Sequence, residues 1–156
     1  IEAGAESVFI VGTQGSKVTK IGGLEPFAET LTSVTLRSNL ISKMENISSL
    51  TKLVKLELYD NQVEALVAPE LAPIGPRLVV LDMSFNLVRS MAPVALCPNL
   101  VELYIAQNRL RKIEGLEDGS ERALRAVPSA RRSARRTTAP RRPARPPSPQ
   151  RRRRCC

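Results

Sequence analysis

The sequence of 156 residues contains no histidine, no tryptophan and only three cysteines. Without histidine, the commonest general base and the usual nucleophile–base pairs are absent, and most zinc sites lose a ligand. Cys97, Cys155 and Cys156 have no regular spacing, which argues against a secreted fold held together by disulfide bonds. Cys97 lies in the apolar stretch ALCPNL, and we expect it to be a buried structural thiol.

Long apolar runs and glycine-rich phosphate loops are also missing. No segment approaches the length of a membrane span, and no signal peptide is visible. Gly12 and Gly15 are too close together for a nucleotide-binding loop, and no amphipathic helix follows them. We therefore expect a soluble intracellular protein that is not an enzyme, with no metal, cofactor, membrane or small-molecule ligand. Because the chain starts at Ile1 rather than at methionine, we also expect a further segment upstream.

Charge divides the chain into two parts. Residues 1–121 contain 11 basic residues and all 15 acidic residues, whereas residues 122–156 contain 13 arginines and no acid. We place the boundary slightly earlier and expect a globular domain at 1–118 and an arginine- and proline-rich tail at 119–156. After Val127 the tail has no Val, Ile, Leu, Met or aromatic residue. It cannot bury a core, and we predict that it is disordered.

Two interpretations of the tail remain open. Arginine pairs well with phosphate, so the tail has the composition of a nucleic-acid-binding or nuclear-targeting segment. Every basic residue in it is arginine, a bias that a GC-rich coding sequence read in a wrong frame or past a splice site also produces. Whichever holds, thirteen arginines predict binding to RNA and other polyanions without sequence preference.

What the globular part does contain is a repeated pattern, L-x-L-x-x-N-x-L-x-x-I. It occurs in full copies that begin at Leu81 and Leu103, and similar segments begin at Val34 and Leu56. The asparagines are 22, 25 and 22 residues apart, which lies within the leucine-rich-repeat period. We assign the three additional residues to an insertion at 67–77, where prolines and a glycine favour a loop or a short turn of helix.

The repeats predict an α/β fold. We expect a right-handed leucine-rich-repeat solenoid, or horseshoe, of about four to five coils with a parallel sheet on its concave face. In each coil an inward-pointing amide would pair with backbone groups that the turn after the strand leaves bare. These structural residues are Asn39, Asn61, Asn86 and Asn108.

Residues 1–31 fit the pattern less well and predict an irregular first coil. Val8 to Val11 has the composition of a short strand, and a turn follows it. We expect Val11, Val18, Ile21 and Leu24 at the core positions, with Ser16 in place of the asparagine.

Side chains alternate along a strand, so those between and just after the core leucines should face outward on the concave sheet. Aromatic residues are scarce in this chain, yet several stand beside acids in these positions. That combination favours binding of a protein partner, and a solvated face with incidental aromatics is the alternative. The candidate partner-binding residues are Arg37, Glu57, Tyr59, Asp60, Asp82, Phe85, Glu102, Tyr104 and Gln107.

The segments TLRSNLISKMENISSLTKLVKLELYDNQVEAL, LDMSFNLVRSM and ELYIAQNRLRKIEGLED resemble a family of known function. They are similar to the leucine-rich-repeat regulatory subunits of protein phosphatase 1, of the regulatory subunit seven type, over roughly residues 8–118. The resemblance implies a non-catalytic scaffold of the nucleus and/or cytoplasm that binds the phosphatase catalytic subunit through concave aromatic and acidic residues. That family has a longer array with a closing cap, where this chain has its arginine tail.

Two other functions remain open on the sequence. One is a different intracellular scaffold of the same repeat class, of the axonemal or dynein-associated type. The other is an RNA-binding protein that acts through the arginine tail. A phosphatase pull-down with and without residues 119–156 separates these functions.

Overall fold

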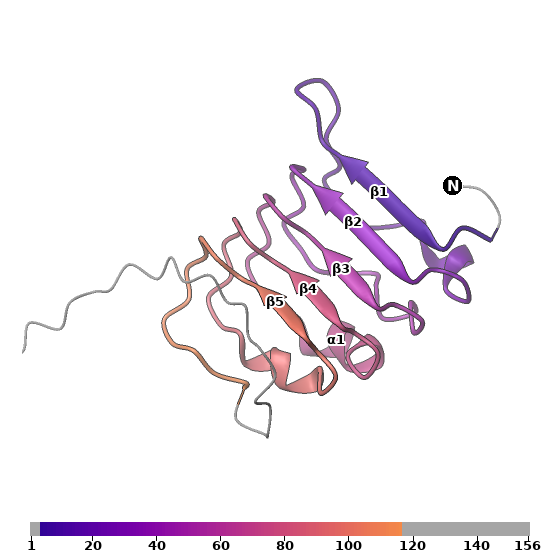
Figure 1. The fold of residues 1–156 in the computed structure, drawn as a ribbon. Helices are drawn as coiled ribbons and strands as arrows, with labels where there is room; N and C mark the ends of the chain where they lie inside the picture. The colour runs from indigo at the N-terminus through magenta and orange to yellow at the C-terminus, as the bar shows by residue number, and fades with distance from the viewer. Residues whose placement is uncertain (1–3, 117–156) are drawn as a thin grey trace, which may run out of the picture.

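The structure, a computed structural model, describes residues 4–116. Five short strands form one parallel sheet in the order β1-β2-β3-β4-β5, so each strand pairs with its neighbours in sequence. Their bounds are β1 Ser7–Val11, β2 Ser33–Arg37, β3 Lys55–Glu57, β4 Val80–Asp82 and β5 Glu102–Tyr104. The strands lie side by side on one face, and the segments that return from each strand to the next lie behind them (Figure 1). The predicted solenoid is confirmed, whereas the predicted boundary at 118 and the arginine tail lie outside the described residues.

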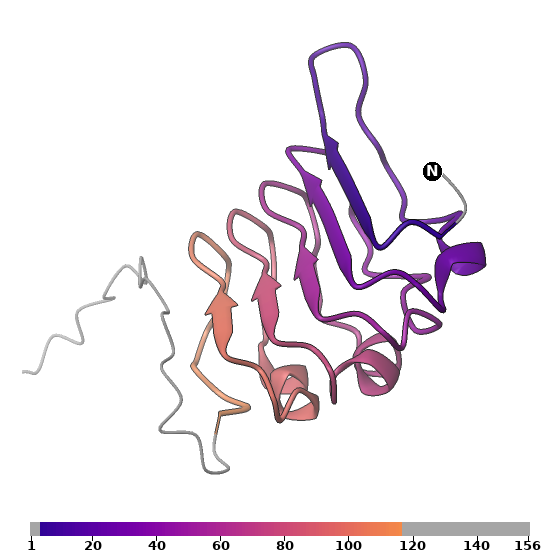
Figure 2. The same cartoon turned by 45° about the vertical axis from the view of Figure 1, so that its right-hand side comes forward.

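Within residues 4–116, three short helices interrupt the return segments, which can be followed in Figure 2. They are the 3₁₀ helix η1 at Glu25–Phe27, the α-helix α1 at Ala68–Ile74 and the 3₁₀ helix η2 at Ala92–Leu96. Each has a proline in its first turn, where the missing N–H would have no helical partner and the fixed φ suits a helix. Helix α1 lies inside the insertion predicted at 67–77 and packs against η2 of the next coil. The three additional residues therefore lengthen one return segment and leave the sheet unbroken.

The core consists of the repeated aliphatic positions, stacked coil upon coil. In the second to fourth coils the pattern residues are buried, as the repeat requires. The fifth coil differs at Ile113, which we expected in the core but which is 75% exposed. The reason is its place at the end of the described array, since no further coil within residues 4–116 stacks against it.

The first coil has a different register from the one that its sequence suggested. Val8 pairs with Val34 and Ile10 with Leu36, so these two residues stand in register with the core positions of the next strand; Val8 is buried, whereas Ile10 is 38% exposed. Val11 was predicted there and is instead 46% exposed. The loop after β1 is three residues longer than in the other coils, and Thr13 and Ser16 bridge across it as a small hairpin.

Beyond that loop the first coil rejoins the pattern. Ser16 does not occupy the asparagine position, because it is paired with Thr13. Ile21 and Leu24 are buried as predicted, and Val18 packs against the core while partly exposed.

Candidate functional site

The four structural asparagines each join two consecutive coils. Asn86 is typical: its Oδ1 accepts a hydrogen bond from the backbone N–H of Val63 at 2.9 Å, and its Nδ2 donates to the carbonyl oxygen of Leu58 at 2.7 Å. The same Nδ2 also lies within hydrogen-bond distance of the carbonyls of Met83 and Ser84 in its own coil. Asn39, Asn61 and Asn108 make equivalent bonds in their coils. These bonds set the path of the chain after β2, β3, β4 and β5.

That path places the residue before each asparagine in the left-handed backbone region. Ser38, Asp60, Phe85 and Gln107 have φ values of +54°, +56°, +58° and +52°. Short polar residues tolerate this region best, whereas a bulky aromatic residue there is a conformational outlier. Phe85 is also 46% exposed, so burial of its ring does not explain its presence.

Phe85 belongs to a stack of three side chains from three consecutive coils. Its ring lies 5.1 Å from the Tyr59 ring, centroid to centroid, with the planes tilted by 56°. The guanidinium carbon of Arg37 lies 5.7 Å from the centroid of the same Tyr59 ring, within the range of a cation–π contact. Three of the sequence-predicted binding residues therefore form one exposed aromatic and cationic surface, which we call the Arg37–Tyr59–Phe85 stack.

Glu57, on β3, forms an ion pair with Arg37 of this stack. Its Oε1 lies 3.1 Å from Nη2 of Arg37 and 3.2 Å from Nζ of Lys55, and its Oε2 accepts a hydrogen bond from Oγ1 of Thr35 at 3.0 Å. Burial would raise the pKa of Glu57, but the hydrogen bonds from Lys55 and Thr35 and the charges of Arg37 and Lys55 outweigh it and hold that pKa below its ordinary value. Glu57 is an ionised, fixed part of the sheet face.

Asp82 occupies the equivalent place one strand later, but its surroundings differ. It pairs in register with Glu57 and is equally buried, at 8% exposed against 7%. Its Oδ1 accepts a hydrogen bond from the backbone N–H of Ser84 at 2.9 Å. Within residues 4–116 no lysine or arginine forms an ion pair with it. The expectation that Glu57 and Asp82 both face solvent is wrong, because neighbouring side chains on the sheet cover them.

The last strand contributes a second acid and a second tyrosine. Tyr104 pairs in register with Asp82, and its hydroxyl donates a hydrogen bond to Oε2 of Glu102 at 2.9 Å. Both side chains are partly exposed, while Asp60 and Gln107 are exposed at the turns after their strands. Asp82, Glu102 and Tyr104 thus form an acidic patch on β4 and β5, which we call the β4–β5 patch.

Two side chains of this face were missed by the sequence interpretation. Lys55 pairs with Glu57, and strand alternation alone places these two residues on the same side of the sheet, so this signal was available. Phe9 is exposed on β1 and pairs in register with Thr35. Phe9 was not among the predicted outward-facing residues because the sequence interpretation assigned a wrong register to the first coil.

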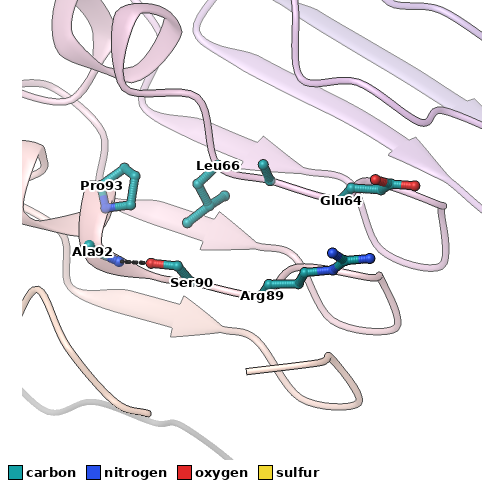
Figure 3. A pocket seen from close by; sticks show the side chains of 7 residues that line it. Glu64, Leu66, Arg89, Ser90, Ala92 and Pro93 are labelled. Carbon is teal, nitrogen blue, oxygen red and sulfur yellow. Dashed lines mark hydrogen bonds between the residues drawn. The ribbon is translucent and has the colours of Figure 1, made fainter. Parts of the chain in front are cut away.

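The back of the solenoid has a shallow, open hollow of about 410 Å³ between the third and fourth coils. Figure 3 shows Glu64 and Arg89 at one end of it, and Leu66, Ala92 and Pro93 at the other. Ser90 there accepts a hydrogen bond from the backbone N–H of Ala92 at 3.2 Å. Oγ of Ser90 also donates a hydrogen bond to Oε1 of Glu114 at 2.6 Å, and residues 4–116 contain no group of three or more potential metal ligands. None of the helices described is long and apolar enough to cross a membrane.

Comparison with solved structures identifies the architecture. An internalin (inlF) from Listeria monocytogenes superposes with a TM-score of 0.52 at 24% identity, over 57% of this chain and 25% of that one. The fold is a leucine-rich-repeat solenoid. Internalin C2 from the same organism gives a TM-score of 0.50 at 23% identity, over 71% of this chain and 56% of that one. A chain of the Toll–Spätzle complex of Drosophila superposes with a TM-score of 0.52 at 24% identity, over 60% of this chain and 13% of that one.

This leucine-rich-repeat chain therefore spans only part of the solved proteins that it matches, from 13% to 56% of their lengths. At these identities the likeness establishes the fold. No family model and no curated protein matches the sequence.

Proposed function

We propose that this chain is a non-catalytic scaffold that binds a protein partner through the concave face of its sheet. The observation that carries the proposal is Phe85, a bulky residue in the left-handed region that remains 46% exposed. Such a residue destabilises the fold by about 1–3 kcal/mol, and outliers of this kind cluster at functional sites. Serine, aspartate and glutamine fill the same position in other coils. A requirement for binding explains why phenylalanine stands at this position, whereas the needs of folding do not.

The neighbouring side chains suit the same role. Exposed aromatic and arginine side chains dominate the energetics of protein interfaces, and the Arg37–Tyr59–Phe85 stack supplies both. The stack is held in place by Glu57, so a partner would lose little side-chain entropy on contact. One solved neighbour belongs to a complex between two proteins, Toll and Spätzle, which is consistent with such a use of the fold.

The partner that we propose is the catalytic subunit of protein phosphatase 1, in the nucleus and/or cytoplasm. Support comes from the repeat segments that resemble the regulatory subunits of that enzyme, which include Tyr59, Phe85 and Tyr104. The remaining candidate residues, Asp60 and Gln107 among them, lie at the rim of the same face. Rim charges act mainly on the rate of association and are screened by salt.

Titration of purified phosphatase catalytic subunit tests this proposal. Phe85→Ala and Tyr104→Ala should each weaken binding by about 1–2 kcal/mol or more, because each removes an aromatic anchor. The matched control is Leu40→Ala, which removes an exposed apolar side chain at a turn and should leave the affinity unchanged. Binding that is equal in all variants, yet lost when residues 119–156 are deleted, would assign the interaction to the tail instead.

A further inference from the structure

Strand β1 forms one edge of the sheet, and among the described strands it pairs only with β2 (Figure 1). The bonds at its two ends show which of its backbone groups face β2. The carbonyl of Glu6 accepts a hydrogen bond from the N–H of Ser33, and the N–H of Gly12 donates to the carbonyl of Arg37. Residues that bond to one neighbouring strand alternate along a parallel ladder, so the even-numbered residues of β1 are bonded to β2.

The odd-numbered residues of β1 therefore direct their backbone groups away from the sheet. Ser7, Phe9 and Val11 each have one N–H and one C=O, and within residues 4–116 these groups have no hydrogen-bond partner. Edge strands are usually protected from further pairing by charged side chains or a proline, and Ser7–Val11 contains neither. The outer edge of β1 is thus a template for one more strand.

The side chains of β1 are apolar on both faces of the sheet. On the concave face, Phe9 is 71% exposed and Val11 is 46% exposed. On the opposite face, Ile10 stands in register with the buried Leu36 and is nevertheless 38% exposed, because no described strand lies beyond β1. A strand that covers this edge must therefore be apolar on both faces. Strand β1 is itself such a strand.

We propose that the chain forms a two-fold symmetric dimer in which β1 pairs antiparallel with β1 of a second copy, with Phe9 opposite Phe9. This register uses all the outward backbone groups. Phe9 exchanges both hydrogen bonds with its symmetry mate, and Ser7 exchanges both with Val11 of the other copy. It also places Val8 of one copy opposite Ile10 of the other, so that the exposed isoleucine gains an apolar neighbour.

The charges that flank β1 fit the same register. Glu6 is exposed just before the strand, and Lys17 is exposed just after the hairpin that follows it. Neither forms an ion pair within residues 4–116. Antiparallel pairing brings the start of one β1 to the end of the other, so Glu6 of each copy comes to the end that carries Lys17 of the other. Residues of opposite charge therefore stand at both ends of the paired strands.

The opposite edge of the described sheet is a poorer match for β1. Strand β5 has three residues against the five of β1, and one of them, Glu102, is acidic. A contact between β1 and β5 of another copy would also be heterologous, and without a closing rotation it continues from copy to copy. The two-fold contact closes at two copies.

Sedimentation equilibrium of the full chain tests the dimer, with a reductant present so that no disulfide joins two copies. The mass should rise with concentration from 17.1 kDa and level off at twice that value. Phe9→Lys places like charges opposite each other at the two-fold axis and should raise the dimer dissociation constant at least about tenfold. Its circular dichroism should match the parent, because Phe9 is mostly exposed. The matched control is Val101→Lys, which adds the same charge at an exposed apolar position before β5 and should leave the dissociation constant unchanged.

Amide hydrogen exchange tests the register residue by residue. The N–H groups of Ser7, Phe9 and Val11 should exchange at least about tenfold more slowly at high than at low protein concentration, because pairing protects them. The N–H groups of Val8 and Ile10 should change less, since they already bond to β2.

A mass of 17.1 kDa at every concentration would overturn the dimer. A mass that grows without limit would also overturn it, because such growth indicates head-to-tail contacts. So would equal weakening by Phe9→Lys and Val101→Lys, or exchange at Ser7, Phe9 and Val11 that does not depend on concentration. The phosphatase is absent from all these measurements, so the dimer and the proposed function stand or fall separately.

Discussion

At the scale of single residues, the asparagines explain how five coils keep one register. Each side-chain amide bonds the backbone of its own turn and of the coil before it, as Asn86 does with Ser84 in its own turn and with Val63 and Leu58 in the coil before. Because these backbone groups are buried, they have no water to replace a lost partner. The asparagine is therefore a connection between coils as well as a turn residue.

Replacing Asn86 with alanine should reduce the free energy of unfolding by about 1–3 kcal/mol, because buried backbone groups lose their partners. Urea denaturation of parent and variant measures the difference. Asn99→Ala is the matched control, since Asn99 makes only an exposed bond to the carbonyl of Pro76 and should change stability little. Equal urea midpoints for Asn86→Ala and the parent would contradict the role of the ladder.

Glu57 predicts how stability depends on pH. The folded-state pKa of this carboxyl lies below its ordinary value of 4.5, so its ionised form stabilises the fold above that pH. The contribution is lost as the pH falls below about 4.5 and through the lower folded-state pKa. The parent should therefore lose more stability on acidification than Glu57→Gln does, as measured by urea midpoints across that range.

The matched control for this pH dependence is Glu64→Gln, at an exposed position that forms no ion pair with any other residue in the range 4–116, and this variant should follow the parent. Parallel curves for the parent and Glu57→Gln would contradict this pH dependence.

Much of this residue-level order could be predicted from spacing alone. A fixed offset from two buried apolar strand residues was enough to place Asn39, Asn61 and Asn86 inward. The burial of Glu57 and Asp82 could not be predicted, because alternation gives the side of the sheet but not what covers it. The left-handed φ of Phe85 had a signal in its place before an asparagine, where other coils have short or polar residues.

At the scale of elements, hydrogen bonds join the return segments across coils as well as the strands. Oε2 of Glu70, in the first turn of α1, accepts hydrogen bonds from the backbone N–H groups of Ile47 and Ser48, both at 2.9 Å. This carboxylate fastens the inserted helix to the coil before it. The insertion is thereby a structural part of the stack.

Glu70→Ala should leave two backbone N–H groups without their partner and destabilise the protein by about 1–3 kcal/mol. Hydrogen exchange at Ile47 and Ser48 should accelerate more than at the amides of β2. Glu70→Gln retains one acceptor oxygen and should fall between the parent and the alanine variant. Unchanged exchange at both amides in Glu70→Ala would contradict this role.

The sequence predicted some features of the helices and strands and missed others. Prolines and a glycine at 67–77 favoured a loop or a short turn of helix, and the structure has the seven-residue helix α1 there. The register of β1 was missed because the hairpin at Thr13 and Ser16 adds residues between the strand and Val18, and a fixed offset cannot detect such an addition. The bond from Glu70 to Ile47 was also missed, since it joins residues 23 positions apart, one coil to the next.

At the scale of the whole molecule, the proposed function assigns folding and binding to separate sets of residues. The core positions and the asparagine ladder build the stack, and the side chains on the sheet are free to vary with the partner. The Arg37–Tyr59–Phe85 stack lies on that variable surface. The central claim is that Phe85 is retained for binding at the expense of stability.

Phe85→Ser, measured for both properties in one variant, tests that claim most directly. Serine already fills this position as Ser38, so relief of backbone strain should offset the lost ring contact with Tyr59. The account predicts a urea midpoint equal to or above that of the parent, together with binding to the phosphatase catalytic subunit that is about tenfold weaker or more. A lower midpoint with unchanged affinity would contradict it, because Phe85 would then serve the fold.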